Sequence, residues 1–185
     1  MKYKLTYILI NAIILSGFDS LSQTSTSVIN PDSVNTTLIE SLIKKKIDSV
    51  RLKHKRNALI LNDILQKAAI DHALYIKNTK KLTHYQNNQK KKTPEKRIAF
   101  YGLENTNTGE NIANTFINTI IENDKGTKYE NLTYKDAAND LVNSWVHSEG
   151  HFENIITQEY LYTGISVSYN KLMMEIYAVQ VFSSE

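Results

Sequence analysis

Apolar residues recur at helical spacing in two neighbouring segments of the first half of the chain. From Thr37 onward, aliphatic residues repeat every three or four positions and lysines fill the other positions: Leu38, Leu42, Ile43, Ile47 and Val50. A second stripe follows Asn62, a suitable helix N-cap, and consists of Ile64, Leu65, Ala68, Ala69, His72, Ala73 and Ile76. Both patterns predict amphipathic helices that pack against a larger core.

The second half of the chain contains two more stripes of this kind. The first predicts a helix from about Asn111 that ends in the polar run 122–131; its members are Ile112, Ala113, Phe116, Ile117 and Ile120. The second consists of Ala137, Ala138, Leu141, Val142 and Trp145. It is preceded by Thr133, which together with Asp136 has the spacing of a helix capping box. We expect Gly150 to end this last helix.

The apolar period changes near the C-terminus. Ile165, Val167 and Tyr169 alternate with small polar residues, and Asn170 and Lys171 lead into a second apolar run at 173–182. This alternation predicts a β-hairpin. By contrast, the segment 85–96, with its three consecutive lysines, is expected to be an exposed loop. Helices followed by an antiparallel hairpin predict an α+β domain.

The N-terminus has the pattern of an export signal. Lys2 and Lys4 precede the apolar run 7–17, which is too short to span a membrane. Small residues at 20 and 22 match the signal peptidase pattern, so we predict a signal peptide at 1–22, a flexible lead-in at 23–36 and a folded domain at 37–185. The predicted location is secreted or periplasmic, with no transmembrane span in the mature chain. An uncleaved anchor helix is the alternative.

Composition narrows the chemistry. The chain contains no cysteine, which excludes disulfides and thiolate catalysis. Residues 41–100 carry 16 Lys and Arg against 4 Asp and Glu, whereas residues 101–185 carry 4 against 12, so we expect basic and acidic regions on the folded surface. The basic clusters lack interleaved aromatic residues and a recognisable reader fold, which argues against nucleic acid as a partner.

Two positions are candidates for function on local pattern. Glu110 follows a glycine and precedes the stripe from Asn111, so it is expected at a helix start, where a simple capping role is the alternative. His151 follows Gly150 and is expected on a turn, where it could face a cleft.

The remaining histidines are weaker candidates for a functional site. His147 and His151 do not form a zinc-protease helix, because Glu149 is not adjacent to the first histidine and Gly150 disfavours a continued helix. His72 falls within an apolar stripe, so we predict a hydrogen-bonded core histidine.

A series of short blocks, in this order, resembles the CAP superfamily, which includes cysteine-rich secretory proteins, antigen 5 and plant pathogenesis-related proteins. The similarity is to the bacterial, SCP-like branch and covers about residues 38–183. The blocks are Arg51, Leu65, Ala68-Ala69, His72-Ala73, 82–84, Arg97, Gly102, 109–113, 134–138, Trp145, Ser148, Gly150-His151, 154–156, Gly164 and 179–182.

The resemblance implies a three-layer α-β-α sandwich with histidines and acidic residues around a central cleft. Carried over, the cleft residues are His84, Glu110 and His151, and Ser148 stands where many eukaryotic members have a second glutamate. Some members bind zinc through the two histidines, so His84 and His151 are the expected metal ligands. Two protein ligands imply weak, exchangeable zinc binding. Glu110 remains open as a third ligand, an orienting group or a catalytic base.

Three functions stay open at this point. The first is an extracytoplasmic binding module whose cleft holds an envelope, peptide or lipid ligand; the absence of an activated Ser or Cys nucleophile and of the second glutamate favours it. The second is a metal-dependent hydrolase of peptide or cell-wall material, with Glu110 activating water. In the third, the polar cleft residues only stabilise the fold.

Overall fold

The structure, a computed structural model, describes residues 5–7, 23–122, 128–130 and 133–185. The predicted signal peptide, except for Leu5–Tyr7, lies outside these ranges, as does its cleavage site after Ser22. Within these ranges, no helix is both long and apolar enough to pass through a membrane.

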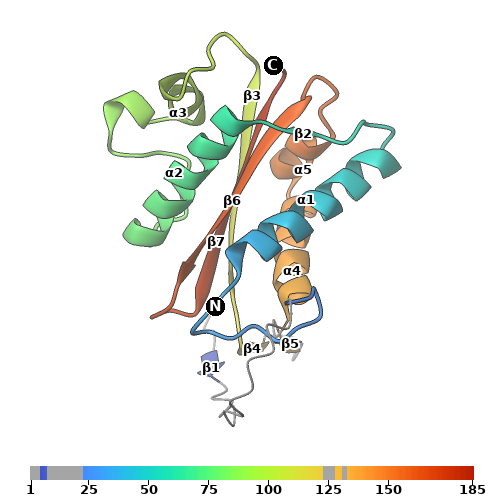
Figure 1. Cartoon of the computed structure of the whole chain (residues 1–185), viewed down its shortest axis with the longest axis vertical. Coiled ribbons are helices and arrows are strands. Elements are labelled where there is room, and N and C mark those ends of the chain that lie inside the picture. Colours follow the sequence, from blue (N-terminus) through green and yellow to red (C-terminus); the bar gives the residue numbers. More distant parts are fainter. Residues whose placement is uncertain (1–4, 8–22, 123–127, 131–132) are drawn as a thin grey trace.

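The domain has three layers, with one β-sheet between two groups of helices (Figure 1). The sheet has the strand order β2-β6-β7-β3, with bounds Ile60–Leu61, Tyr162–Asn170, Glu175–Ser183 and Thr108–Phe116. Helices α2 (Asp63–Thr79) and α3 (Pro94–Phe100) cover one face. Helices α1 (Thr36–Lys53), α4 (Tyr134–Val146) and α5 (Glu149–Ile156) cover the other. The predicted α+β sandwich is confirmed.

The three long strands pair antiparallel, and β7 lies in the middle of them. It pairs with β3 from Ser183–Thr108 to Glu175–Phe116 and with β6 over nine residue pairs. The short β2 runs parallel to β6. A separate small sheet joins β1 (Leu5–Tyr7), β4 (Thr119–Glu122) and β5 (Lys128–Glu130). Among the described residues, β3 has a neighbouring strand in the main sheet on one side only, namely β7.

Both faces of the main sheet are buried. In β7, Ile176, Ala178 and Phe182 belong to the core under α1 and α4, whereas Tyr177 and Val179 belong to the core under α2. Alternate side chains of one strand thus enter two different cores, as expected for a sheet covered on both sides.

Three of the predicted helices are present at the expected places. Helix α1 starts at Thr36, one residue before the predicted start, and α2 starts after Asn62, whose side chain accepts hydrogen bonds from the amides of residues 64 and 65. Helix α4 has the predicted capping box of Thr133 and Asp136. The hairpin of β6 and β7 is also confirmed, with the turn at 171–174.

The helix predicted from Asn111 is wrong, because residues 108–116 form the strand β3. The stripe that suggested a helix included Ile112 and Ala113, which are adjacent in sequence. In the structure, Ile112 enters the core under α2 and Ala113 the core under α4. A strand buried on both faces does not alternate between apolar and polar residues, so its pattern also fits a helix. Glu110 consequently lies within a strand and does not cap a helix.

The predicted role of Gly150 as a helix terminator is also wrong. Helix α4 ends at Val146, and the chain bends at His147 and Ser148 before α5 begins at Glu149. Gly150 lies in the first turn of α5, where an added Cβ would contact nothing within 4 Å. His151 therefore lies on a helix and not on a turn.

The predicted loop 85–96 contains more structure than expected. Residues Gln89–Lys91 form a short 3-10 helix, η1, and Pro94 is the first residue of α3, with Thr93 as its N-cap. Proline is well tolerated at this first position because its missing N–H would have no helical partner there. As a result, α3 carries Arg97 into the interior.

The segment expected as a flexible lead-in packs against the start of α4. Val28 forms a β-bridge with Thr133, and Ile29 is buried. The carbonyl of Ile29 accepts a hydrogen bond of 3.0 Å from the side chain of Asn118.

Helix α2 lies directly on β6 at Gly164. A Cβ atom at this position would be 2.2 Å from the carbonyl carbon of Leu65 and 2.4 Å from the amide nitrogen of Gln66, so no other residue fits without moving the helix. The side chain of Gln66 bonds both backbone groups of Ile165, at 2.7 and 3.0 Å. This close contact fixes α2 against the sheet, and with it His72 and the chain that follows.

Candidate functional site

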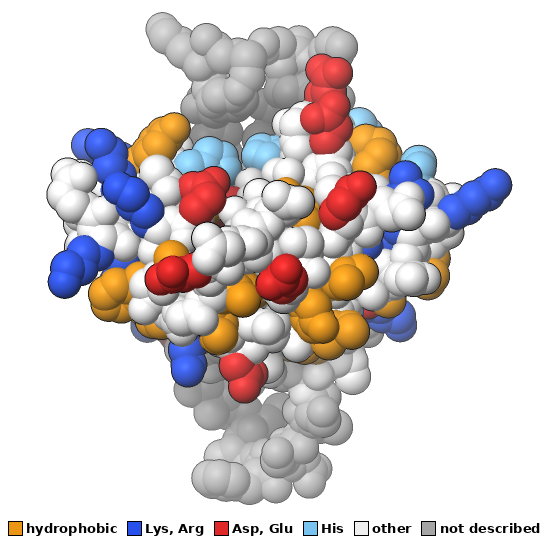
Figure 2. Space-filling model, turned by 90° about the horizontal axis from the view of Figure 1, so that it is seen from above, with side chains coloured by type: hydrophobic (Ala, Val, Ile, Leu, Met, Phe, Trp, Pro, Cys, Tyr) orange, Lys and Arg blue, Asp and Glu red, His pale blue; other side chains and the backbone are white. Residues whose placement is uncertain are grey.

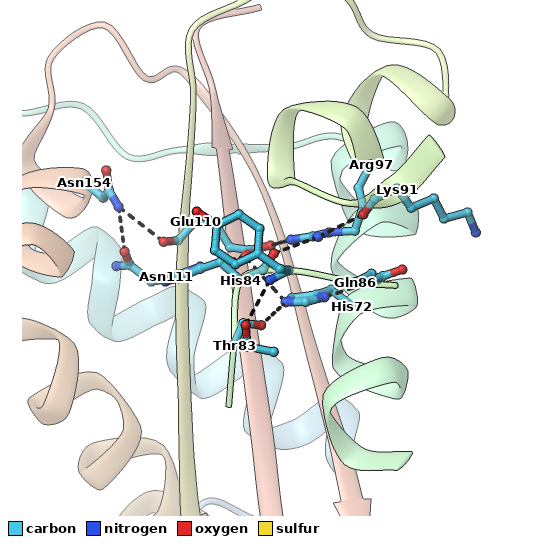
Figure 3. Close-up of polar contacts among 10 residues, drawn as sticks. His72, Thr83, His84, Gln86, Lys91, Arg97, Glu110, Asn111 and Asn154 are labelled. Carbon is cyan, nitrogen blue, oxygen red and sulfur yellow. Dashed lines mark hydrogen bonds and ion pairs between the residues drawn. The ribbon is translucent and has the colours of Figure 1, made fainter. Parts of the chain in front are cut away.

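The candidate site lies at the free edge of β3 (Figure 3). Successive residues of this strand point to opposite layers. The side chain of Glu110 points toward α3 and bonds Arg97, whereas the side chain of Asn111 points toward α5 and donates to the carbonyl of His151 at 3.0 Å. Asn154 of α5 donates to both the Asn111 side chain and the Glu110 carbonyl. Residues 110 and 111 of β3 thus connect the two helical layers by hydrogen bonds.

Glu110 is a buried carboxylate with both oxygens bonded. Its Oε1 lies 2.8 Å from Nδ1 of His84, and its Oε2 accepts a hydrogen bond of 2.5 Å from Arg97. Burial raises the pKa of Glu110, but the hydrogen bond from His84 and the charge of Arg97 outweigh it and hold the pKa below its usual value. Because Glu110 is ionised and only accepts, Nδ1 of His84 carries the proton of this hydrogen bond, and Nε2 is the ring nitrogen that Glu110 does not engage.

Arg97 connects this carboxylate to the preceding loop. Besides Glu110, its guanidinium donates to the carbonyls of His84 and Lys91, at 3.0 and 3.2 Å. It is almost completely buried. Sequence reasoning did not assign Arg97 to the site, and the one usable signal is that a buried Glu110 needs a positive partner.

His72 of α2 holds the loop that carries His84 in place through two hydrogen bonds. Its Nε2 donates to the carbonyl of Thr83 at 2.8 Å, and its Nδ1 accepts from the amide of Gln86 at 3.2 Å. Burial lowers the pKa of His72 from 6.5 to about 4, so the ring is neutral and its 3.6 Å approach to Glu110 is not an ion pair at neutral pH. It is the hydrogen-bonded core histidine predicted from sequence, and it fixes the residue next to His84.

We expect His72 to make the domain less stable in mild acid. Because its pKa in the folded protein is about 4 and in the unfolded chain about 6.5, the unfolded chain binds the proton first as the pH falls. The free energy of unfolding should therefore drop by about 3 kcal/mol between pH 6.5 and 4 from this group alone. Glu110, whose pKa is lowered, contributes its own loss only below about pH 4.5.

Urea unfolding at several pH values checks this expectation. The His72→Gln variant keeps a donor and an acceptor but does not titrate, so its curve of unfolding free energy against pH should be flatter from pH 6.5 to 4.5. An equally steep curve in the variant would contradict the assignment.

His151 approaches His84 from the other layer. The centroids of the two rings are 6.3 Å apart with planes inclined by 50°. The side chain of His84 is 39% exposed, and His151 is half-buried. Burial, together with the nearby His84, lowers the pKa of His151, so its ring is neutral at neutral pH. Two imidazoles from different layers therefore lie close together at a partly solvent-exposed position.

The pair has suitable chemistry for a divalent metal. Two imidazoles that bind zinc at about 2.1 Å and at the tetrahedral angle have ring centroids about 5.3 Å apart. The observed separation of 6.3 Å is about 1 Å wider, so the two rings must move closer by about this amount to share an ion. Over the described part of the chain, however, no cluster of three or more His, Cys, Asp or Glu side chains that could hold a metal is found. Both oxygens of Glu110 are already bonded, so the two histidines are the ligands that this site offers.

Two further residues singled out in the sequence lie outside this network. Ser148 is the N-cap of α5, and its hydroxyl makes no capping hydrogen bond. The exposed ring of His147 bonds the carbonyl of Asn143 in the preceding helix, α4, at 2.8 Å. The structure therefore brings together His84, Glu110 and His151 and leaves Ser148 without a hydrogen bond to any of them.

Charge is unevenly distributed on the end of the molecule where β3 begins. Figure 2 shows this face with carboxylates across its middle, Lys and Arg side chains at its two flanks and histidines along one rim. The unequal charge of the two sequence halves thus becomes an acidic centre between basic flanks on this face.

The chain was compared with protein families and with known proteins. The sequence model described as the cysteine-rich secretory protein family, CAP, matches residues 45–182. A comparison with curated proteins gives no match.

Among solved structures, an outer surface protein of Borrelia burgdorferi is 22% identical with a TM-score of 0.64, and the match covers 81% of this chain and 95% of that one. An extracellular SCP-domain protein of Bacillus anthracis is 18% identical with a TM-score of 0.62, covering 81% and 41%. A cysteine-rich secretory protein of Staphylococcus aureus is 13% identical with a TM-score of 0.55, covering 82% and 40%. This chain thus spans less than half of the latter two. These likenesses establish a shared fold.

Proposed function

Because this chain belongs to the cysteine-rich secretory protein (CAP) family, we propose that it is an exported binding protein whose cleft holds an exchangeable divalent ion, zinc, at His84 and His151. The observation that carries the proposal is the pair of imidazoles over the edge of β3, with ring centroids 6.3 Å apart and with one ring fixed by Glu110. The ion supplies a Lewis-acidic centre with open positions for a ligand oxygen from an envelope, peptide or lipid component.

The contacts of Glu110 favour one of the three roles left open by the sequence. Its Oε1 holds Nδ1 of His84, which leaves Nε2 of that ring as the metal ligand. A carboxylate that orients a ligating histidine in this way is a common feature of metal sites. In the proposed function Glu110 therefore orients His84 and does not bind the ion itself.

The same contacts support binding over hydrolysis. A general base needs a free oxygen and a pKa near the working pH. Both oxygens of Glu110 are engaged, and its pKa is held below the usual value. If the protein nevertheless hydrolysed envelope or peptide substrates with zinc, activity that survived in Glu110→Gln would exclude Glu110 as the base.

Export is part of the proposal. It is supported by the predicted signal peptide at 1–22 and by two proteins that share the fold, one an outer surface protein and the other an extracellular protein. Peptide mapping of the protein recovered outside the cytoplasm should give Gln23 as the first residue, and a mature chain that retains Met1 would contradict the cleavage.

Calorimetric titration of the exported protein with zinc chloride tests the metal site. We expect one weak site per chain, and a loss of about tenfold or more in affinity in the His84→Ala, His151→Ala double variant. Glu110→Gln should weaken zinc by about 10- to 100-fold while leaving the site in place. The matched control is His147→Ala, which removes an exposed histidine four residues from His151 and should not alter affinity. Unchanged affinity in a folded double variant would overturn the proposal.

A further inference from the structure

A second surface lies at the other end of the sheet, where the turn between β6 and β7 meets the end of α2. The two segments line a shallow, open hollow of about 300 Å³. We call it the hairpin hollow; its lining residues are Lys77, Asn78, Lys80, Tyr169, Asn170, Lys171 and Leu172. Three of these seven residues are lysines and none is acidic.

A leucine at the rim of the hairpin hollow does not pack into either hydrophobic core. Leu172 is 94% exposed at the tip of the turn, far more than any other large apolar side chain that the structure describes. A leucine that protrudes this far gains no burial within the domain, and the gain becomes available when another apolar phase covers it.

The outer side of α2 also carries exposed apolar side chains. Ile70 and Leu74, one helical turn apart, are 42% and 43% exposed. Lys67 and Lys77 lie three residues before and after this pair, so the same outward stripe carries two apolar and two basic side chains. Lysine stems can cover apolar surface while their ammonium groups stay in water.

The charge at this end is positive. The nearby carboxylates are already engaged, because Asp32 lies 2.7 Å from the ammonium of Lys171 and Asp71 lies 2.8 Å from that of Lys91. Lys77 and Lys80 have no carboxylate within ion-pair distance among the described residues. The hairpin hollow therefore offers two ammonium groups without an acidic partner beside a protruding leucine.

We infer that this surface docks on an anionic phospholipid bilayer, with lipid phosphates at the lysines of the hairpin hollow and Leu172 in the outer acyl region. Lysines at the surface of an anionic membrane are attracted to it, and apolar side chains beside them add burial. A soluble phosphate would satisfy the lysines but would leave Leu172, Ile70 and Leu74 in water. An acidic protein partner would need an apolar recess whose shape matches the protruding Leu172. A bilayer needs no such match, because its acyl chains adapt to the shape of the side chain.

Docking here would leave the metal cleft free. Glu110 pairs with Val181, whereas the turn follows the Phe116–Glu175 pair, six residues further along β3. At about 3.3 Å per residue, the hairpin tip is about 20 Å from the cleft. The inference therefore does not depend on the proposed metal site.

Sedimentation of the full mature chain with vesicles tests the inference. We expect binding to vesicles of phosphatidylcholine with one third phosphatidylglycerol, little binding to phosphatidylcholine alone, and weaker binding at high salt. Leu172→Asp should lower the partition coefficient by about tenfold or more. The triple variant Lys77→Glu, Lys80→Glu, Lys171→Glu should abolish binding.

A matched triple variant makes the same change in net charge elsewhere. Lys45, Lys53 and Lys96 are exposed on α1 and α3, and their replacement by Glu should leave most of the binding intact. Equal loss in both triple variants, or full binding by Leu172→Asp, would overturn the inference. So would binding to polyglutamate or to glycerol phosphate with no binding to vesicles, which would point to an acidic protein or a soluble phosphate. Zinc titration of the same variants should be unchanged.

Discussion

Replacement of Arg97 by methionine is expected to lower the free energy of unfolding by about 3–5 kcal/mol at pH 7, because it leaves a buried charge without its partner. The Arg97 guanidinium bonds Oε2 of Glu110, and both side chains are almost fully buried. Without Arg97, burial would raise the pKa of Glu110, so the deficit relative to wild type should shrink as the pH falls and the carboxyl group becomes neutral.

A double-mutant cycle separates this charge effect from lost packing. Glu110→Gln keeps the shape but leaves the buried Arg97 guanidinium without its counter-charge, so it should also destabilise the domain, by an amount similar to that of Arg97→Met. The double variant should be less destabilised than the sum of the two single variants by about 1–3 kcal/mol. Urea unfolding of all four proteins at pH 7 gives these values. Additive effects would show that the buried pair is not coupled.

Replacement of Arg51 by methionine is expected to destabilise the domain by a similar amount, about 3–5 kcal/mol, for a different reason. Arg51 is buried near the end of α1 and donates to four backbone carbonyls, at 2.7–3.0 Å, with no carboxylate among these partners. They belong to Asn57, Ile155, Thr157 and Tyr160. Methionine fills the space but leaves these acceptors unpaired.

Arg56 is the matched control for this change. It also donates to a carbonyl of the same segment, that of Ile156 at 2.8 Å, but it is half-exposed. Water can replace its hydrogen bonds, so Arg56→Met should cost about 1 kcal/mol or less. Arg51→Lys, with fewer donors in a different geometry, should fall between the two methionine variants. Equal effects of Arg51→Met and Arg56→Met in urea unfolding would contradict the expected role of Arg51.

Local signals in the sequence were sufficient where one face of an element is buried and its ends carry capping residues. Helix α2 follows its apolar stripe from the cap at Asn62, and α4 follows the capping box at Thr133. The hairpin was visible because β6 alternates between apolar and small polar residues. These features depend on contacts within a few residues, which a pattern along the chain records directly.

The same signals failed where an element is buried on both of its faces, or where only a few residues separate two elements. Strand β3 enters two cores and so has no alternation to recognise. Gly150 suggested a stop, but α4 had already ended, and the exposed glycine is tolerated in the first turn of α5. Pro94 suggested a loop and instead begins α3. In each case the packing of distant elements overrides the local preference.

By itself the sequence determined the α+β class, the positions of three helices and the hairpin, and, through resemblance, which histidines and which carboxylate to examine. Only the tertiary structure decided how they meet: residues 108–116 form a strand between two helical layers, so the successive side chains of residues 110 and 111 reach opposite layers. The role of Arg97 also appeared only there, because a buried carboxylate finds its counter-charge through space and not through sequence spacing.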